Sequence, residues 1–246
     1  MESQFKLPTE TVELPSKGLL YPEDSPLSSG KIEMKYMTAK EEDILTNQNY
    51  INNGTVIDKL LRSLIVTEGV KYEDILIGDK NAIMVAARVL AYGKDYSFKV
   101  LGEEFTVDLS TLENKKVDYS LFKNRENDFP FKLPNVDATV TVKLLTHKDE
   151  QLIDREMKGN KKINKNSSTL TTSRLKYIIT SINGSRETKD IRNFVDNYLL
   201  AKDARAIRKY HAEITPDVEM TYERDGGREV AEIPIGINFF WPDITT

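Results

Sequence analysis

A series of prolines near the start of the chain constrains the fold more than any other feature of the sequence. Four of them recur within residues 5–30: Pro8, Pro15, Pro22 and Pro26. Proline lacks a backbone N–H and clashes with a preceding helical turn, so no helix can run through this segment. The segment is nevertheless too apolar for a disordered tail. We therefore expect residues 1–30 to form an extended arm that lies on another surface.

The apolar side chains of this arm are its candidate contacts. They include Leu14, Leu19, Leu20 and Tyr21. Because the arm contributes no periodic core face, we predict that these residues bind either another chain or the arm's own domain. Deleting residues 1–30 should then leave the helical core folded while weakening assembly.

Strand and helix patterns follow the arm. Residues 31–37 alternate apolar and polar side chains, which is typical of a half-buried strand. Helical patterns then fill residues 38–93, beginning at a candidate Thr38–Glu41 capping box and ending at Gly93. Asp79 is expected to cap the last of these helices.

The remaining elements are predicted in the same way. They are a hairpin at 96–109, a strand at 138–145, helices within 146–213 that include one over 172–183, and a terminal hairpin within 217–242. The fold class is therefore α+β, with two helical units each followed by a β-hairpin and an extended Pro-rich N-terminal arm. The expected divisions are the arm at 1–30, an N-terminal α+β unit at 31–124, and a C-terminal helical block with a terminal β-hairpin at 125–246.

The apolar segment INFFWP at 237–242 contains the only tryptophan. It is either a strand returned to the core or an adhesive surface for another chain. We interpret it as the last strand of the terminal hairpin. Because Phe239 and Phe240 would point to opposite faces of a strand, one of them should look outward. We therefore predict that Phe239, Phe240 and Trp241 bind a partner.

Composition excludes several classes of protein. The 246 residues are 39% hydrophobic, so the chain can bury a sizeable core, and the formal net charge of −4 lacks the basic excess of a dedicated nucleic-acid binder. With no cysteine there is no disulfide, thiol nucleophile or thiolate metal site. No apolar run approaches the ~20 residues that span a bilayer, and the start lacks a signal-peptide pattern. We expect a protein that is neither exported by a standard signal nor embedded in a membrane.

Catalytic motifs are absent from the sequence. It holds no H-E-x-x-H, G-x-S-x-G, P-loop or G-x-G-x-x-G pattern. The two histidines, His147 and His211, each stand alone and are expected to be exposed residues near helix ends, because a metal site needs three or four convergent ligands. We therefore predict a protein that is not an enzyme, with no cofactor and no metal. Only a buried acid cluster would revive a hydrolase.

Basic residues offer one alternative function. They are Lys158, Lys161, Lys162 and Lys165, which Arg205, Arg208 and Lys209 could join. Together they could touch phosphate in a nucleic-acid-associated module. The acids nearby favour a solvated face instead; they are Asp149, Glu150, Asp154 and Glu156.

Three stretches in order resemble a known family. They are LPSKGLLYPEDSPLSSGKIEMKYMTAKEEDILTNQNYINNGTVIDKLL at 14–61, ILIGDKNAIMVAARVLAYGKDY at 75–96 and IPIGINFFWPDI at 233–244. The chain resembles the baseplate hub subunit family of T-even-like contractile-tailed bacteriophages. Some relatives carry Cys-x-x-Cys pairs in the two hairpins, which this chain lacks, so a zinc role does not carry over.

The resemblance implies a structural or assembly-assisting role without catalysis. The partners would be other baseplate hub or tail proteins, such as the hub and the tape measure protein. The location would be the virion tail baseplate, and the host cytoplasm during assembly. A transient assembly chaperone absent from the mature virion remains an alternative, as does the nucleic-acid-associated module, and the resemblance is compatible with an oligomer in the assembly.

Overall fold

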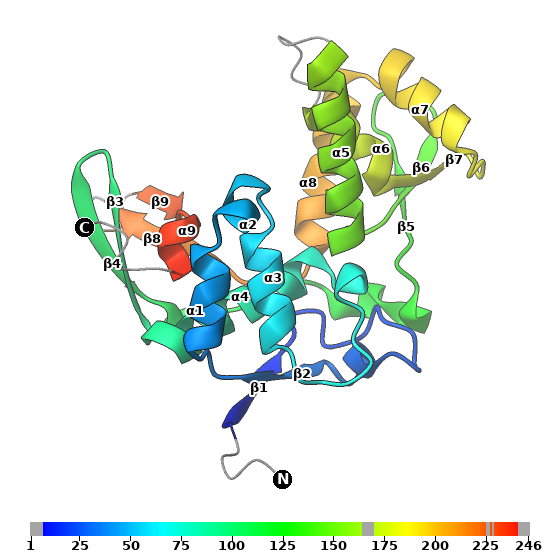
Figure 1. The fold of residues 1–246 in the computed structure, drawn as a ribbon. Helices are drawn as coiled ribbons and strands as arrows, with labels where there is room; N and C mark the ends of the chain where they lie inside the picture. The colour runs from blue at the N-terminus through cyan, green and yellow to red at the C-terminus, as the bar shows by residue number, and fades with distance from the viewer. Residues whose placement is uncertain (1–6, 164–169, 225–226, 228, 241–246) are drawn as a thin grey trace.

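The fold is α+β, as predicted (Figure 1). The computed structural model describes residues 7–163, 170–224, 227 and 229–240. The helices are α1 (Ala39–Thr46), α2 (Gln48–Asn52), α3 (Val56–Leu64), α4 (Ile77–Tyr92), α5 (His147–Ile163), α6 (Leu170–Ile178), α7 (Thr188–Asn197), α8 (Ala201–Ile214) and α9 (Ile237–Phe240). The strands are β1 (Thr9–Glu13), β2 (Lys31–Lys35), β3 (Asp95–Val100), β4 (Glu103–Asp108), β5 (Phe129–Lys132), β6 (Thr139–Val142), β7 (Ile179–Ile182), β8 (Thr221–Arg224) and β9 (Glu229–Glu232). No described helix combines the length and the apolar character needed to cross a bilayer.

The sheets are small and antiparallel. Among the described strands, β1–β2, β3–β4 and β8–β9 are separate pairs, and β5–β6–β7 form a three-stranded sheet in that order. Figure 1 places β5–β7 with α5–α8 on one side of the molecule, and α1–α4 with the hairpin β3–β4 on the other. The elements therefore gather into two groups, which backbone hydrogen bonds join where α4 and α5 begin: Ile77 N–H donates to the Leu145 carbonyl at 3.0 Å, and His147 N–H donates to the Ile75 carbonyl at 2.8 Å.

The N-terminal arm belongs to the core. Leu14, Leu20, Tyr21 and Leu27 are between 1% and 6% exposed, and Leu19 is half-buried. These side chains are buried without the regular apolar spacing of a helix or strand, because they lie in the irregular loop between β1 and β2. The prediction that the helical core would stay folded without residues 1–30 is inconsistent with this packing.

Two glycines close the loop of the arm. Gly18 and Gly30 have φ values of +72° and +71°, and a Cβ on Gly18 would lie 2.5 Å from the Gly30 nitrogen. The Leu14 N–H also donates to the Gly30 carbonyl at 2.8 Å. Only glycine allows the backbones to approach this closely with left-handed φ. The arm thus returns to β2 as a closed loop rather than as an open extension.

Local patterns correctly predicted the helical unit. Helix α4 spans Ile77–Tyr92 and ends at Gly93, whose φ is +81°. At the start of α1, Glu41 Oε2 accepts hydrogen bonds from the Thr38 N–H at 3.0 Å and from its hydroxyl at 2.6 Å. The hairpin predicted over 96–109 is present as β3 and β4. These elements depend on neighbours close in sequence, which is why their residues predict them.

One helix prediction in the second half is wrong in part. The helix expected over 172–183 ends at Ile178, and residues 179–182 form β7 instead. Val140 of β6 pairs with Ile182, and Thr141 pairs with Ser181. Isoleucine and threonine are β-branched and fit a pleated sheet well. Residues 179–182 could bury their isoleucines either in a longer helix or in a strand. Pairing with the open edge of β6 favours the strand.

The C-terminal elements pack on the first half of the chain. Tyr222 of β8 lies 4.9 Å from Phe98 and 5.0 Å from Phe105, measured between ring centroids. The Tyr96 hydroxyl donates to the Pro234 carbonyl at 2.9 Å. Figure 1 shows β8, β9 and α9 on the same side of the molecule as β3–β4, away from α5–α8. The terminal hairpin therefore completes the core of the first unit.

The strand predicted for INFFWP is wrong over its described part. Residues 237–240 form the short helix α9, and Phe239 and Phe240 are both 0% exposed. Phe239 packs edge-on against Tyr96 at 4.9 Å and against Phe240 at 5.1 Å. A strand would point one ring outward, whereas the helical turn buries both. Trp241 and Pro242 lie outside the described residues.

Candidate functional site

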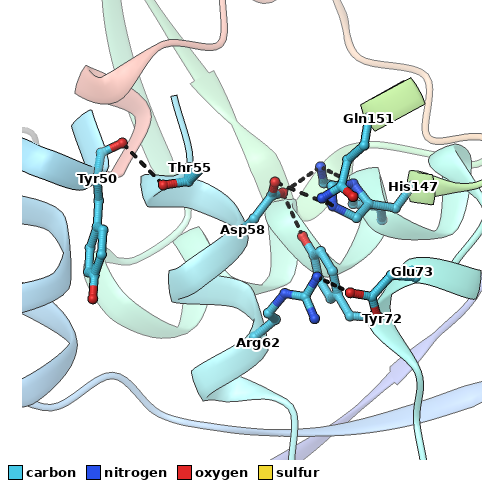
Figure 2. A network of polar contacts seen from close by, with 9 residues as sticks. Tyr50, Thr55, Asp58, Arg62, Tyr72, Glu73, His147 and Gln151 are labelled. Atoms are coloured by element: carbon cyan, nitrogen blue, oxygen red, sulfur yellow. Dashed lines mark hydrogen bonds and ion pairs between the residues drawn. The ribbon is translucent and has the colours of Figure 1, made fainter. Parts of the chain in front are cut away.

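A polar cluster joins α3, α4, α5 and the 3₁₀ turn Tyr72–Asp74 (Figure 2). Asp58 on α3 is its centre. Its Oδ1 accepts hydrogen bonds from Lys80 Nζ at 2.8 Å and from the Tyr72 hydroxyl at 3.1 Å, and its Oδ2 lies 3.3 Å from His147 Nε2. One carboxylate thus contacts three other elements of the fold.

His147 is held by its own chain at both ring nitrogens. Lys80 Nζ lies 3.2 Å from Nδ1, and the Gln151 amide nitrogen lies 2.9 Å from Nε2. Because an ammonium can only donate, Nδ1 accepts and the ring proton is on Nε2, facing Asp58. An amide nitrogen also only donates, so Gln151 makes a hydrogen bond with Nε2–H only when its amide is turned to present the oxygen. The side chain is 3% exposed, and burial, together with the Lys80 charge, lowers its pKa. His147 is therefore a neutral, fully occupied ring and not a free base.

Tyr72 and its neighbours form the outer layer of the cluster. The Arg62 guanidinium lies 4.4 Å from the centroid of the Tyr72 ring, and it donates to Glu73 Oε1 at 2.7 Å. That hydrogen bond lowers the pKa of the Glu73 carboxyl. Burial and the Asp58 charge raise the pKa of the Tyr72 hydroxyl. The phenol therefore stays protonated and continues to donate to Asp58.

A hollow opens beside this cluster, between the 3₁₀ turn and α5. Its volume is about 370 Å³, and it is lined by Lys71, Glu73, Asp74, Lys148, Gln151, Leu152 and Arg155. A second hollow shares Glu73 and Gln151 and reaches Asp58 and Arg62. The buried hydrogen bonds of the cluster lie next to this charged surface. The arrangement can hold the elements in place and present charge, because its imidazole has no nitrogen left for a substrate.

A second polar centre attaches the arm to α4. Asp79 Oδ1 accepts from the Ser16 N–H at 2.8 Å, and Oδ2 accepts from the Ser16 and Tyr21 hydroxyls, each at 2.6 Å. The Tyr21 hydroxyl in turn accepts from the Leu76 N–H at 2.9 Å. Burial raises the pKa of Asp79, which is 1% exposed. Asp79, expected as a cap of α4, instead binds the arm.

The residues predicted to bind a partner are placed apart. Tyr21 reaches the first turn of α4, whereas Phe239 packs on Tyr96, just beyond the end of that helix. The five buried members of the set do not offer an exposed surface in the folded chain; they are Leu14, Leu20, Tyr21, Phe239 and Phe240. Leu19 is half-buried. Partner binding by Trp241 stays a prediction.

Both histidines differ from their predicted environment. His147 is buried in the cluster, and His211 of α8 is half-buried with Nε2 3.1 Å from the Lys143 carbonyl. Burial lowers the pKa of His211 to about 4. Sequence reasoning missed the cluster because Asp58 and His147 are far apart in the chain and share no motif. The one usable signal was His147 at the start of an amphipathic helix.

The predicted basic residues lie on two helices. Lys158, Lys161 and Lys162 belong to α5 and are exposed, and Lys165 is outside the described residues. Arg205, Arg208 and Lys209 belong to α8 and are also exposed. Within the described ranges, no group of three or more His, Asp or Glu side chains is placed to hold a metal ion. Comparison with family models, curated proteins and solved structures found no match to this chain.

Proposed function

We propose that this chain is a structural or assembly-assisting protein of the phage tail baseplate hub, and that it acts by binding other tail proteins without catalysis. The observation that supports this most directly is the closed state of its polar centre. Both nitrogens of His147 and both oxygens of Asp58 are used by the chain's own side chains. Such a centre fixes helices relative to one another, which is what a rigid assembly component requires. The resemblance of the stretches at 14–61, 75–96 and 233–244 to the baseplate hub subunit family is the reason for proposing the tail baseplate as the assembly.

Co-expression with tail proteins tests this proposal. The chain would be produced with the hub and tape measure proteins of a phage that encodes it, and the mixture separated by size-exclusion chromatography. Co-elution with at least one tail protein is expected, and a soluble protein from outside the tail serves as the control. Failure to form a complex with any tail component would contradict the proposal.

The permanent component and the transient chaperone differ in the finished particle. A permanent component remains in purified virions at a fixed ratio to other baseplate proteins. A chaperone is found with tail proteins in the host cytoplasm during assembly but is lost from the virion. Quantitative mass spectrometry of purified virions distinguishes the two.

A nucleic-acid-associated module is the second candidate. Exposed lysines on α5 favour it, because they remain accessible to phosphate. Each phosphate contact contributes a slope of about −0.9 to the dependence of log K on log salt concentration for duplex DNA. A DNA-binding titration at several salt concentrations that gives no binding removes this candidate.

A further inference from the structure

The outward side of α5 carries a stripe of positive charge, which we call the cationic face and define as Lys148, Arg155, Lys158 and Lys162. All four are exposed. Lys148, Arg155 and Lys162 recur every seven residues. At about 100° per residue, the four side chains fall within an arc of about 80° around the helix. The cations therefore share one side of α5.

Three of the four acids of α5 point away from this face. These three turn toward the rest of the protein and pair there. Asp149 lies 2.7 Å from Lys143, Glu150 lies 3.3 Å from Arg174, and Glu156 lies 2.6 Å from Arg192. Asp154 is exposed and borders the face at Lys158, which lies four residues on and about 40° around the helix, whereas Lys148, Arg155 and Lys162 lie about 80–120° away from it. Folding thus separates charges that are mixed in the sequence.

The cationic face continues into the hollow beside α5. Lys71 lines that hollow together with Lys148 and Arg155. In the part of the chain that the structure describes, these three cations form no ion pair. A Cβ placed on Gly159, which lies about 20° outside the arc on the Lys148 side, would meet no atom within 4 Å. A rod-like partner therefore has space along the helix and charge on which to bind.

We propose that the cationic face binds an acidic helical segment of a partner protein, with the end of that segment in the hollow. A seven-residue repeat on one helix matches the repeat of a second helix lying alongside it. Leu152, which is half-buried and lines the hollow about 40° around the helix from Lys148, offers an apolar contact beside the charges. Glu73 and Asp74 line the hollow and would repel a phosphate chain, whereas the N-terminal end of a helical segment presents free backbone N–H donors to them. Charge complementarity therefore favours a protein segment over nucleic acid.

Fluorescence anisotropy with defined probes tests the inference. The first probe is a labelled 21-residue helical peptide. It carries a glutamate at every seventh position and one leucine between successive glutamates. The second is a scrambled peptide of the same composition, and the third is a 20-base-pair DNA duplex. The full-length protein should bind the first peptide at least about tenfold more tightly than the scrambled one, because only the regular spacing meets the cationic face in register.

Charge-reversal variants locate the binding. Lys148→Glu/Arg155→Glu/Lys162→Glu should weaken peptide binding at least about tenfold, since each change replaces an attraction with a repulsion. The matched control, Lys40→Glu/Lys99→Glu/Lys202→Glu, makes the same charge change at exposed sites elsewhere and should keep most of the affinity. Circular dichroism checks folding, and the corresponding triple glutamine variant replaces the reversal if that variant is unfolded.

Four outcomes would overturn the inference. They are no peptide binding, equal binding of the scrambled peptide, equal loss in both variants, and tighter binding of the DNA duplex. The inference rests on the proposed function in that both require a protein partner. They fail separately, however. A tail complex that forms equally well with the reversed variant refutes only the cationic face, whereas peptide binding without any tail complex refutes only the proposed function.

Discussion

Replacing Tyr21 by phenylalanine should reveal how strongly the arm is attached to α4. The variant keeps the buried ring and removes one oxygen. That oxygen donates to Asp79 Oδ2 at 2.6 Å and accepts from the Leu76 N–H at 2.9 Å. Both partners are buried, so water cannot readily replace the lost bonds.

The expected cost follows from these two hydrogen bonds. A bond to a charged group contributes about 1.5–3 kcal/mol, and a buried donor left without a partner costs about 1–3 kcal/mol. Asp79 keeps both of its Ser16 donors, which limits the first contribution. Tyr21→Phe should therefore lower the free energy of unfolding by about 3–5 kcal/mol, a large part of the ~5–15 kcal/mol typical of a domain.

Urea unfolding, followed by circular dichroism at neutral pH, measures this change. Tyr50→Phe is the matched control, because the described residues give the Tyr50 hydroxyl no hydrogen bond and Figure 2 shows it directed away from Thr55. The control should change stability by less than about 0.5 kcal/mol. A loss of less than 1 kcal/mol for Tyr21→Phe, or equal losses for both variants, would refute the account of the arm as part of the core.

Three further predictions concern the core. Deleting residues 1–30 should abolish cooperative thermal unfolding, since it removes the partner of β2 and uncovers the buried Asp79; a deletion variant with a normal melt would contradict this. Phe239→Ala should cost about 3–5 kcal/mol in urea unfolding, because the ring is fully buried, whereas a cost near zero would place α9 outside the core. His211 titrates near 6.5 when unfolded and at about 4 when folded, so the unfolded state binds more protons between these values. Stability should therefore fall by about 3 kcal/mol as the pH drops from 6.5 to 4, and His211→Asn should flatten this dependence in urea melts at each pH.

Local interactions explain which parts of the fold the sequence predicts. The stripe of α4, the Thr38–Glu41 capping contacts and the β3–β4 hairpin depend on residues within a few positions of one another. The strand β7 depends instead on the open edge of β6, and a pattern of isoleucines cannot tell whether that edge is nearby. The helix α9 buries two adjacent rings only because Tyr96 and α4 form a surface beneath them.

The candidate site is still less visible in the sequence. Asp58, Lys80 and His147 come from three separate helices, and no spacing rule connects them. The cationic face was hidden for a different reason. Its lysines are obvious, but the direction of Asp149, Glu150 and Glu156 follows from cations on other elements, which only the packed structure supplies.

The contact of Tyr222 with Phe98 also has a consequence for synthesis on the ribosome. Tyr222 emerges 124 residues after Phe98. At a translation rate of about 5–20 residues per second, synthesis of the segment from Phe98 to Tyr222 takes about 6–25 s. The aromatic surface of β3–β4 lacks its contact with Tyr222 for that time. During that time Phe98 and Tyr96 are exposed on a nascent hairpin, as they would be on any product of premature termination. The first unit therefore reaches its native state only after nearly the whole chain has been translated, and this delay is when a chaperone would be needed most.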